Sequence, residues 1–234
     1  MVFSMLQAGL WAALAAASLL VGAYLAVRFT VPTKLVGRIM GFGAGALVAA
    51  LAYELIPDSH VADLQIWLSF GAGALLFYSL DSVLEARSAG ASGPGLAIAL
   101  GALLDGVPES IVLGVGIAVG GSVSVGFLVA VLVSNIPEGL SATADLRTTR
   151  SPAWIYRLWG SIALMSGTAA ALGYLVAHHL STLDGRYVQA LAAGAVLTML
   201  SDSMMPEAFK EGGRPTALLT ALGFAVAALL TTLD

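Results

Sequence analysis

Apolar residues form long, nearly continuous blocks along this chain, and short polar breaks separate them. Eight such blocks lie at about 4–27, 34–58, 66–86, 94–120, 123–147, 153–178, 187–209 and 215–233. Roughly 20 apolar residues in a helix are enough to cross the hydrocarbon core of a bilayer. The pattern therefore predicts an all-α polytopic membrane protein of eight transmembrane helices, with residues 1–234 forming a single transmembrane domain.

The composition agrees with this prediction and removes several other classes of protein. Hydrophobic residues make up 59% of the 234 residues and charged residues only 10%, whereas soluble domains have about 45–50% and about 25%. The net charge of −4 leaves no basic surface for a nucleic acid. The absence of cysteine excludes disulfides, thiolate metal sites and cysteine nucleophiles.

The basic residues predict the orientation in the membrane. Only Arg186 lies at an even-numbered connection between the predicted helices. The other nine of the ten lie at odd-numbered connections, and they are Arg28, Lys34, Arg38, Arg87, Arg147, Arg150, Arg157, Lys210 and Arg214. Cytoplasmic loops carry an excess of Lys and Arg, so we expect both termini outside. Short loops and the many Ala, Gly and Val residues favour the plasma (inner) membrane of a prokaryotic cell.

Four of the eight prolines lie inside apolar helices, and an acidic residue follows each one: Pro57-Asp58, Pro108-Glu109, Pro137-Glu138 and Pro206-Glu207. A proline in a helix interior removes one backbone hydrogen bond and leaves the carbonyl four residues earlier unpaired. In lipid this is tolerated only where protein, water or an ion satisfies the freed group. The pattern thus indicates a polar interior.

Two of these segments are similar and lie at the same predicted depth. Leu-Asp-Gly-Val-Pro-Glu-Ser-Ile spans 104–111, and Val-Ser-Asn-Ile-Pro-Glu-Gly-Leu spans 133–140. Pro108 follows Pro94 by 14 residues, about 21 Å along a helix. Pro137 follows Ser124 by 13 residues on a helix of opposite direction, about 20 Å from the other side. Both Pro-Glu pairs are therefore expected near the midplane.

Helical spacing brings a set of oxygen ligands together at that depth. Residues four apart share one helix face, which pairs Asp105 with Glu109 and Ser134 with Glu138, while Asn135 lies three residues before Glu138. No basic residue is expected at this depth, and buried carboxylates are normally paired. The acids must therefore be protonated, hydrated or bound to a cation. We predict a metal site formed by Asp105, Glu109, Ser134, Asn135 and Glu138.

Further acids indicate a route through the protein. Glu54 and Asp58 are expected near the outer end of the second helix, and Asp202 and Glu207 near the inner end of the seventh. The similar Pro-acid segments of these two helices favour an inverted repeat of helices 1–3 and 6–8, an arrangement that supports alternating access in transporters. For Asp81, Glu85 and Asp145, a structural role as protonated carboxyl groups explains the sequence equally well.

At these residues the chain resembles the ZIP (Zrt/Irt-like) family of divalent-metal transporters. The resemblance rests on Asn135-Ile136-Pro137-Glu138-Gly139 and, less closely, on the segment from Asp105 to Glu109; Glu54–Asp58 and Met205–Ala208 also look like segments of that family. It implies eight helices with both termini outside, arranged as helices 1–3 and 6–8 around helices 4–5. It also implies that metal moves toward the cytoplasm through a midplane carboxylate site.

The chain departs from the family motif at three positions. Asp105 stands where the family usually has His, Gly106 where it usually has Asn, and Ser110 where it usually has Gly. The predicted sixth helix, 153–178, has no acidic residue, so whether one or two metals bind stays open. An all-oxygen site suits harder ions than an imidazole site does. We therefore expect zinc or a harder divalent ion such as manganese or iron as substrate.

We expect no enzymatic activity, no organic cofactor and no nucleic-acid partner; the expected partners are the metal ion and the lipid bilayer, and a homodimer is compatible with the sequence. Two alternatives stay open. A ZIP-like membrane protein that does not transport would keep the same pattern. An intramembrane aspartyl hydrolase would use a dyad such as Asp105 and Asp202, but the sequence has no Gly-x-Gly-Asp segment to favour it.

Overall fold

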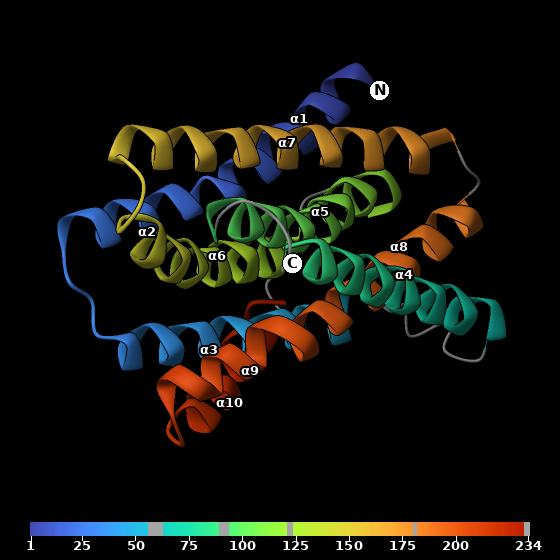
Figure 1. Cartoon of the computed structure of the whole chain (residues 1–234). Coiled ribbons are helices and arrows are strands. Elements are labelled where there is room, and N and C mark those ends of the chain that lie inside the picture. Colours follow the sequence, from blue (N-terminus) through green and yellow to red (C-terminus); the bar gives the residue numbers. More distant parts are fainter. Residues whose placement is uncertain (56–62, 89–93, 121–123, 180–181, 232–234) are drawn as a thin grey trace.

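The computed structural model describes residues 1–55, 63–88, 94–120, 124–179 and 182–231, and every regular element in these ranges is a helix (Figure 1). The α-helices are α1 (Val2–Ala16), α2 (Ser18–Arg28), α3 (Thr33–Ala50), α4 (Leu64–Ser88), α5 (Pro94–Gly120), α6 (Val125–Leu146), α7 (Pro152–His179), α8 (Thr182–Met199), α9 (Met205–Gly212) and α10 (Thr216–Leu230). Two short π-helical segments, η1 (Leu51–Leu55) and η3 (Leu200–Met204), continue α3 and α8.

These elements confirm the all-helical prediction and its eight helical stretches. The first stretch is α1 with α2, the second is α3 with η1, and the seventh is α8 with η3 and α9. In the described ranges, seven stretches are long and apolar enough to cross a membrane. The eighth, α10, is apolar but has only 15 residues. The structure thus supports a polytopic membrane protein, in which seven of the eight helical stretches reach spanning length within the described residues.

The helices pack as two groups that meet along one boundary (Figure 1). In the first group α1 and α5 pack on α7, and α2 packs on α6. In the second group α10 and α9 pack on α3, and α4 packs on α8. The groups meet where α3 contacts α6 and where α5 contacts α8. Residues from both groups can therefore line any cavity at this boundary.

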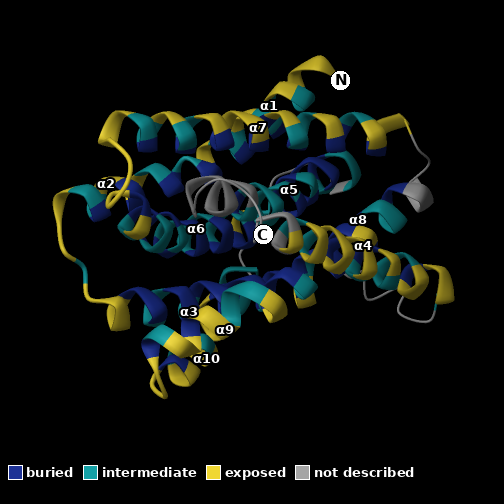
Figure 2. Cartoon of the chain, viewed as in Figure 1, coloured by how far each residue is buried: buried dark blue, intermediate teal, exposed yellow. Residues whose placement is uncertain are grey.

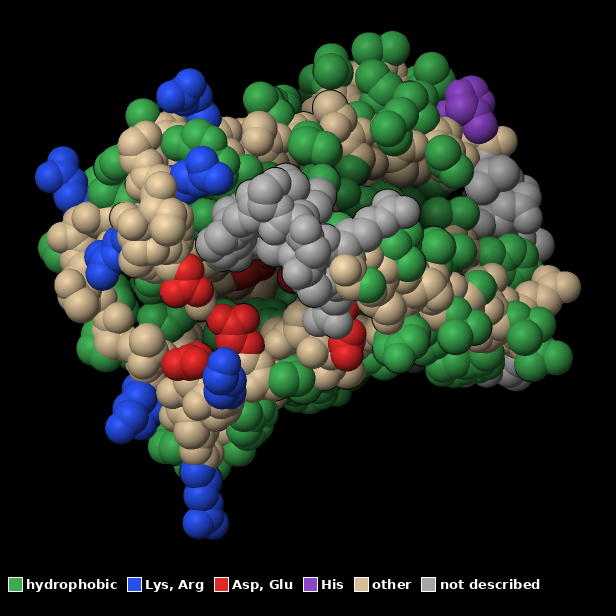
Figure 3. Space-filling model, viewed as in Figure 1, with side chains coloured by type: hydrophobic (Ala, Val, Ile, Leu, Met, Phe, Trp, Pro, Cys, Tyr) green, Lys and Arg blue, Asp and Glu red, His purple; other side chains and the backbone are tan. Residues whose placement is uncertain are grey.

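Many outward-facing positions of the helices are exposed (Figure 2), and hydrophobic side chains cover much of the face shown in Figure 3. Leu218 is 77% exposed, Leu164 71% and Leu75 69%. Soluble monomers rarely expose contiguous apolar patches of such extent. Lipid chains are the natural environment for this surface, so the outward-facing residues agree with a membrane-embedded protein.

Glycines allow α4 and α8 to pack with their backbones in contact. A Cβ atom at Gly73 would overlap the carbonyl oxygen of Leu191, and one at Gly194 would overlap that of Phe70. Small residues at helix interfaces in membranes permit this close approach. Any side chain at these two positions must push the helices apart.

Helices α3 and α10 also pack with their backbones in contact at glycines. A Cβ atom at Gly45 would overlap the carbonyl oxygen of Thr220, and one at Gly223 would overlap that of Phe42. Gly45 lies 12 residues before Pro57, just as Gly194 lies 12 residues before Pro206. The α3–α10 and α4–α8 contacts therefore have the same register in the sequence relative to these two prolines.

The π-helical segments repeat this register. In the sequence, both η1 and η3 begin six residues before a proline, Pro57 or Pro206, and end two residues before it. In η3 the widened turn lets the backbone N–H of Met205 donate to the carbonyl of Leu200, five residues earlier. Single π-turns inside α-helices frequently occur at functional sites. Each segment also carries an acid, Glu54 in η1 and Asp202 in η3.

Substitution of Gly73 tests the close packing of α4 on α8. Because a Cβ atom there would overlap a backbone carbonyl, we expect Gly73→Ala to destabilise the fold by about 1–3 kcal/mol, as overpacking does elsewhere. Gly71→Ala is the matched control, since a Cβ atom at Gly71 has no neighbour within 4 Å. Thermal unfolding in detergent measures both; equal melting temperatures for the two variants would contradict the predicted overlap.

Candidate metal site

Four of the five predicted metal ligands line a single cavity at the boundary between the two helix groups. This inner cavity has a volume of about 40 Å³. It is lined by Met40, Asp105, Glu109, Ser134, Glu138, Met199, Ser203, Met204 and Glu207. The carboxylates of α5 and α6 come from the first group, while the methionines and Glu207 come from the second.

Helical spacing positions the ligands of the first group. Pro108 and Pro137 lie inside α5 and α6, and the acid after each faces the inner cavity. Glu109 is buried, with 4% of its surface exposed. The hydroxyl of Ser134 donates to the carbonyl of Val131 at 3.0 Å, which leaves its oxygen able to accept or to ligate.

The acidic side chains act on one another across the cavity. Glu138 interacts electrostatically with Asp105, Glu109 and Glu207. Asp105 interacts in the same way with Asp81 of α4 and with Glu207. Among the residues that line the inner cavity none is cationic. Because like charges so close disfavour one another's ionisation, a cation is the partner that would stabilise the ionised cluster.

The carboxylates line one cavity without forming a finished coordination shell. Within the described ranges, no three side chains of His, Cys, Asp and Glu are grouped closely enough to hold a metal ion as they stand. Binding an ion in the inner cavity would therefore require side-chain rotation, helix movement or ligands of another kind.

Asn135, the fifth predicted ligand, is not brought into the inner cavity. It lies on the other side of Glu109 and lines a smaller cavity of about 10 Å³, together with Gly106 and Ser166. The side-chain amide of Asn135 donates to the carbonyl of Ala15 at 3.3 Å. The structure thus gives Asn135 a role in holding α6 against α1.

A second and larger cavity, which we call the vestibule, adjoins the inner cavity. It has a volume of about 420 Å³ and is lined by Val31, Thr33, Val36, Gly37, Met40, Leu140, Ser141, Ala144, Asp145, Pro206, Glu207, Lys210 and Glu211. Met40 and Glu207 line both cavities. The hydroxyl of Ser141 donates to the Glu207 carboxylate at 2.7 Å. Figure 3 shows acidic side chains around a hollow on this face.

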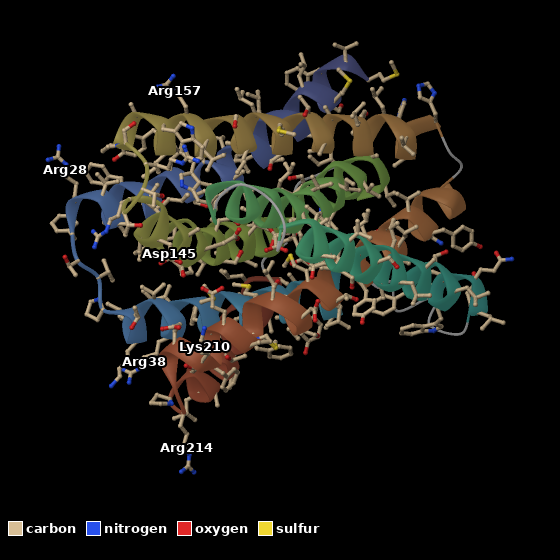
Figure 4. All side chains as sticks on the ribbon, viewed as in Figure 1. Arg28, Arg38, Asp145, Arg157, Lys210 and Arg214 are labelled. Atoms are coloured by element: carbon tan, nitrogen blue, oxygen red, sulfur yellow. The ribbon has the colours of Figure 1, made fainter. Side chains whose placement is uncertain are left out.

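The vestibule opens at the end of the molecule where basic residues gather. Figure 4 labels Arg28, Arg38, Arg157, Lys210 and Arg214 at this end, which also holds Asp145. The ammonium group of Lys210 lies 4.0 Å from the carboxylate of Glu211. This is the end that the basic residues of the sequence assign to the cytoplasm.

At the opposite end, Glu54 joins three helices. Its carboxylate accepts a hydrogen bond from the hydroxyl of Ser124, which caps α6. Its backbone carbonyl accepts one from the side-chain amide of Gln189 in α8, at 3.2 Å. A Cβ atom at Gly126 would overlap the Glu54 carboxylate, so α6 approaches η1 closely here.

The other predicted pathway residues have different outcomes. Glu207 lines both the inner cavity and the vestibule. Asp202 is exposed and lines neither of these two cavities. Asp58 lies outside the described residues.

Sequence reasoning did not identify several residues that line the inner cavity. Met40, Met199 and Met204 resemble any other apolar residue in a membrane helix, and Ser203 has no motif around it. In the sequence, the Pro206-Glu207 pair marks the end of this stretch as unusual, and the structure adds the π-helical segment η3 just before it.

Comparison with known proteins does not extend this picture. No protein-family model matches the chain, and no curated protein matches it.

Proposed function

We propose that this protein transports a divalent metal cation across the membrane toward the cytoplasm. The observation that carries the proposal is the inner cavity, where Asp105, Glu109 and Glu138 converge and no cationic side chain among the lining residues neutralises them. Buried carboxylates need a partner in a medium of low polarity. A divalent cation supplies it, and the adjoining acidic vestibule supplies a way out.

The substrate we propose is zinc or a harder divalent ion such as manganese or iron. Carboxylate and hydroxyl oxygens bind such ions well, and Ser134 and Ser203 add neutral oxygens to the carboxylates of the inner cavity. The ion would draw side chains of α5 and α6 together, because their separation leaves no closed shell in this conformation. One midplane site per chain is the simplest arrangement, because the small cavity that Asn135 lines has a single carboxylate, that of Glu109.

The proposed cycle is alternating access between two ends of the membrane. The conformation described here fits the stage open to the cytoplasm, because the vestibule reaches the inner cavity while Glu54, Ser124 and Gln189 join helices at the opposite end. The matched registers of Gly45 with Gly194, and of η1 with η3, support an inverted repeat. Inverted repeats are a common basis for alternating access.

We propose in addition that the chain is ZIP-like: eight transmembrane helices, with helices 1–3 and 6–8 around helices 4–5. An aspartyl hydrolase is disfavoured, because Asp202 is exposed and does not share the cavity of Asp105. A protein of the same fold that binds metal without moving it is distinguished from a transporter by uptake measurements.

Neutralising the midplane acids tests the proposed function. We expect Glu109→Gln and Glu138→Gln each to abolish metal uptake into proteoliposomes and to weaken Mn²⁺ binding at least about tenfold, because a charged oxygen ligand is lost from a site of low polarity. Size-exclusion chromatography in detergent checks that both variants remain folded.

Glu211→Gln is the matched control for this experiment. It makes the same chemical change, Glu to Gln, but Glu211 lines the vestibule and not the inner cavity. We expect its Mn²⁺ affinity to stay within about threefold of that of the parent protein, since Glu211 does not line the inner cavity and water and salt screen a partly exposed charge. Parent-like uptake by both midplane variants would contradict the site assignment.

Single-cysteine labelling tests the direction of transport. The chain has no cysteine, so His179→Cys at the end of α7 and Ser151→Cys before α7 each introduce a unique thiol at an exposed position. We expect an impermeant maleimide to label intact cells at residue 179 and to reach residue 151 only after lysis, because the basic end faces the cytoplasm. The reverse pattern would overturn the proposed direction.

A further inference from the structure

A further cavity, which we call the apolar groove, lies between α4, α5 and α8. It has a volume of about 260 Å³, and all twelve residues that line it are apolar. Helix α4 contributes Leu76, Leu80 and Leu84, which are spaced by four residues and therefore share one helix face. Leu76 is 52% exposed and Leu80 46% exposed, so this wall of the groove reaches the outer surface, where lipid surrounds a membrane protein.

The apolar groove and the inner cavity lie on neighbouring faces of α5. Leu104 and Pro108 line the groove, whereas Asp105 and Glu109, which directly follow them, line the inner cavity. The sequence places Pro108 near the midplane of the membrane. The groove is therefore expected within the hydrocarbon layer of the bilayer, at the depth of lipid chains and not of headgroups.

Both helix groups form walls of the apolar groove. Helix α5 belongs to the first group, while α4 and α8 belong to the second, and α8 contributes Leu191, Ala192 and Ala195. The groove keeps this form only while the two groups keep this relative position. A ligand favours the conformation to which it binds more tightly, so a molecule bound in the groove would stabilise the present arrangement of the groups.

We propose that the apolar groove binds an acyl chain of a membrane phospholipid, which holds the two helix groups in the conformation open to the cytoplasm and slows transport. The effect on transport rests on the proposed function, whereas the binding of the chain does not.

The lining of the groove and its depth both favour an acyl chain as the ligand. The apolar lining residues offer no side-chain hydrogen bond to a polar ligand, and an unpaired polar group at this depth is costly. An empty groove would lose dispersion contacts along its walls. A flexible hydrocarbon chain restores these contacts, and lipid chains are the molecules present at this depth.

A tethered chain tests the effect on transport. Because the sequence has no cysteine, Leu76→Cys introduces a unique thiol at the groove, to which hexadecyl methanethiosulfonate attaches a long alkyl chain. Tethering raises the effective concentration of this chain at the groove. We expect it to slow metal uptake into proteoliposomes at least about fivefold. A reducing agent that releases the chain should restore the uptake rate.

Leu75→Cys is the matched control for the tether. Leu75 directly precedes Leu76 and is also exposed, but it does not line the groove. A chain attached there would extend into the surrounding lipid, so we expect the uptake rate to change less than about twofold. Methyl methanethiosulfonate on Leu76→Cys modifies the same thiol without adding a chain, and it should leave the rate unchanged.

Native mass spectrometry of the purified full chain in detergent tests the binding itself. We expect each parent chain to retain one phospholipid. Ala192→Phe should lose it, because Ala192 lines the groove and a phenyl ring there would occupy the space of the acyl chain. Ala225→Phe is the matched control, since Ala225 is exposed on α10 and does not line the groove. Size-exclusion chromatography checks that both variants remain folded.

The outcomes separate this inference from the proposed function. Metal uptake by the parent protein, with equal rates for chains attached at residues 75 and 76 and no retained phospholipid, would overturn the inference and leave the transporter proposal standing. A dimer that retains no phospholipid and that Ala192→Phe dissociates would place a second copy in the groove and overturn it as well. A parent protein that imports no metal would contradict the proposed function, and the retained phospholipid would then decide the binding of the acyl chain.

Discussion

The arrangement of this protein depends on acidic side chains held in a membrane interior without basic partners. Hydration offsets little of the free-energy cost of burying these charges, because the surrounding helices exclude most of the water. Glu109 is buried, and Asp105 and Glu138 share its cavity, which has no cationic lining residue. Such a cluster is stable only if protons, water or a cation neutralise it. A site that must exchange these partners is suited to carrying ions and poorly suited to serving as a structural core.

Helix irregularity is the second condition for such a site. Pro108 and Pro137 interrupt the hydrogen bonding of α5 and α6 next to the acids. On the other side of the boundary, η3 widens the helix just before Pro206 and brings Met199 and Met204 to the cavity. Backbone groups freed in this way are tolerated at membrane depth where they line a polar cavity. The helix irregularities therefore lie next to the cavity because the polar cavity can satisfy the backbone groups that they free.

The sequence predicts the helices and the acidic residues and Ser134 of the inner cavity, but not the residues of the second helix group that line it beside Glu207. The reason is physical. Apolar block length determines the spans, and a spacing of four pairs Asp105 with Glu109 because both ligands belong to one helix. Which helices meet across the boundary depends on long-range packing, for example glycine contacts that no local pattern reveals. Met40 and Met199 could not be assigned to the cavity for this reason, since the sequence of a membrane helix does not show whether a methionine faces lipid or a cavity.

The division of the cavity between two helix groups links binding to movement. Asp105, Glu109 and Glu138 are fixed to the first group, while Met40 and Glu207 are fixed to the second. A relative displacement of the groups would separate these side chains from one another, and on the proposed function it would weaken the binding of an ion. On the proposed function, the same motion that opens one end of the pathway therefore lowers the affinity of the site. The affinity of the site and its accessibility to one side of the membrane would then change together. An ion would leave on the side toward which the helix groups separate.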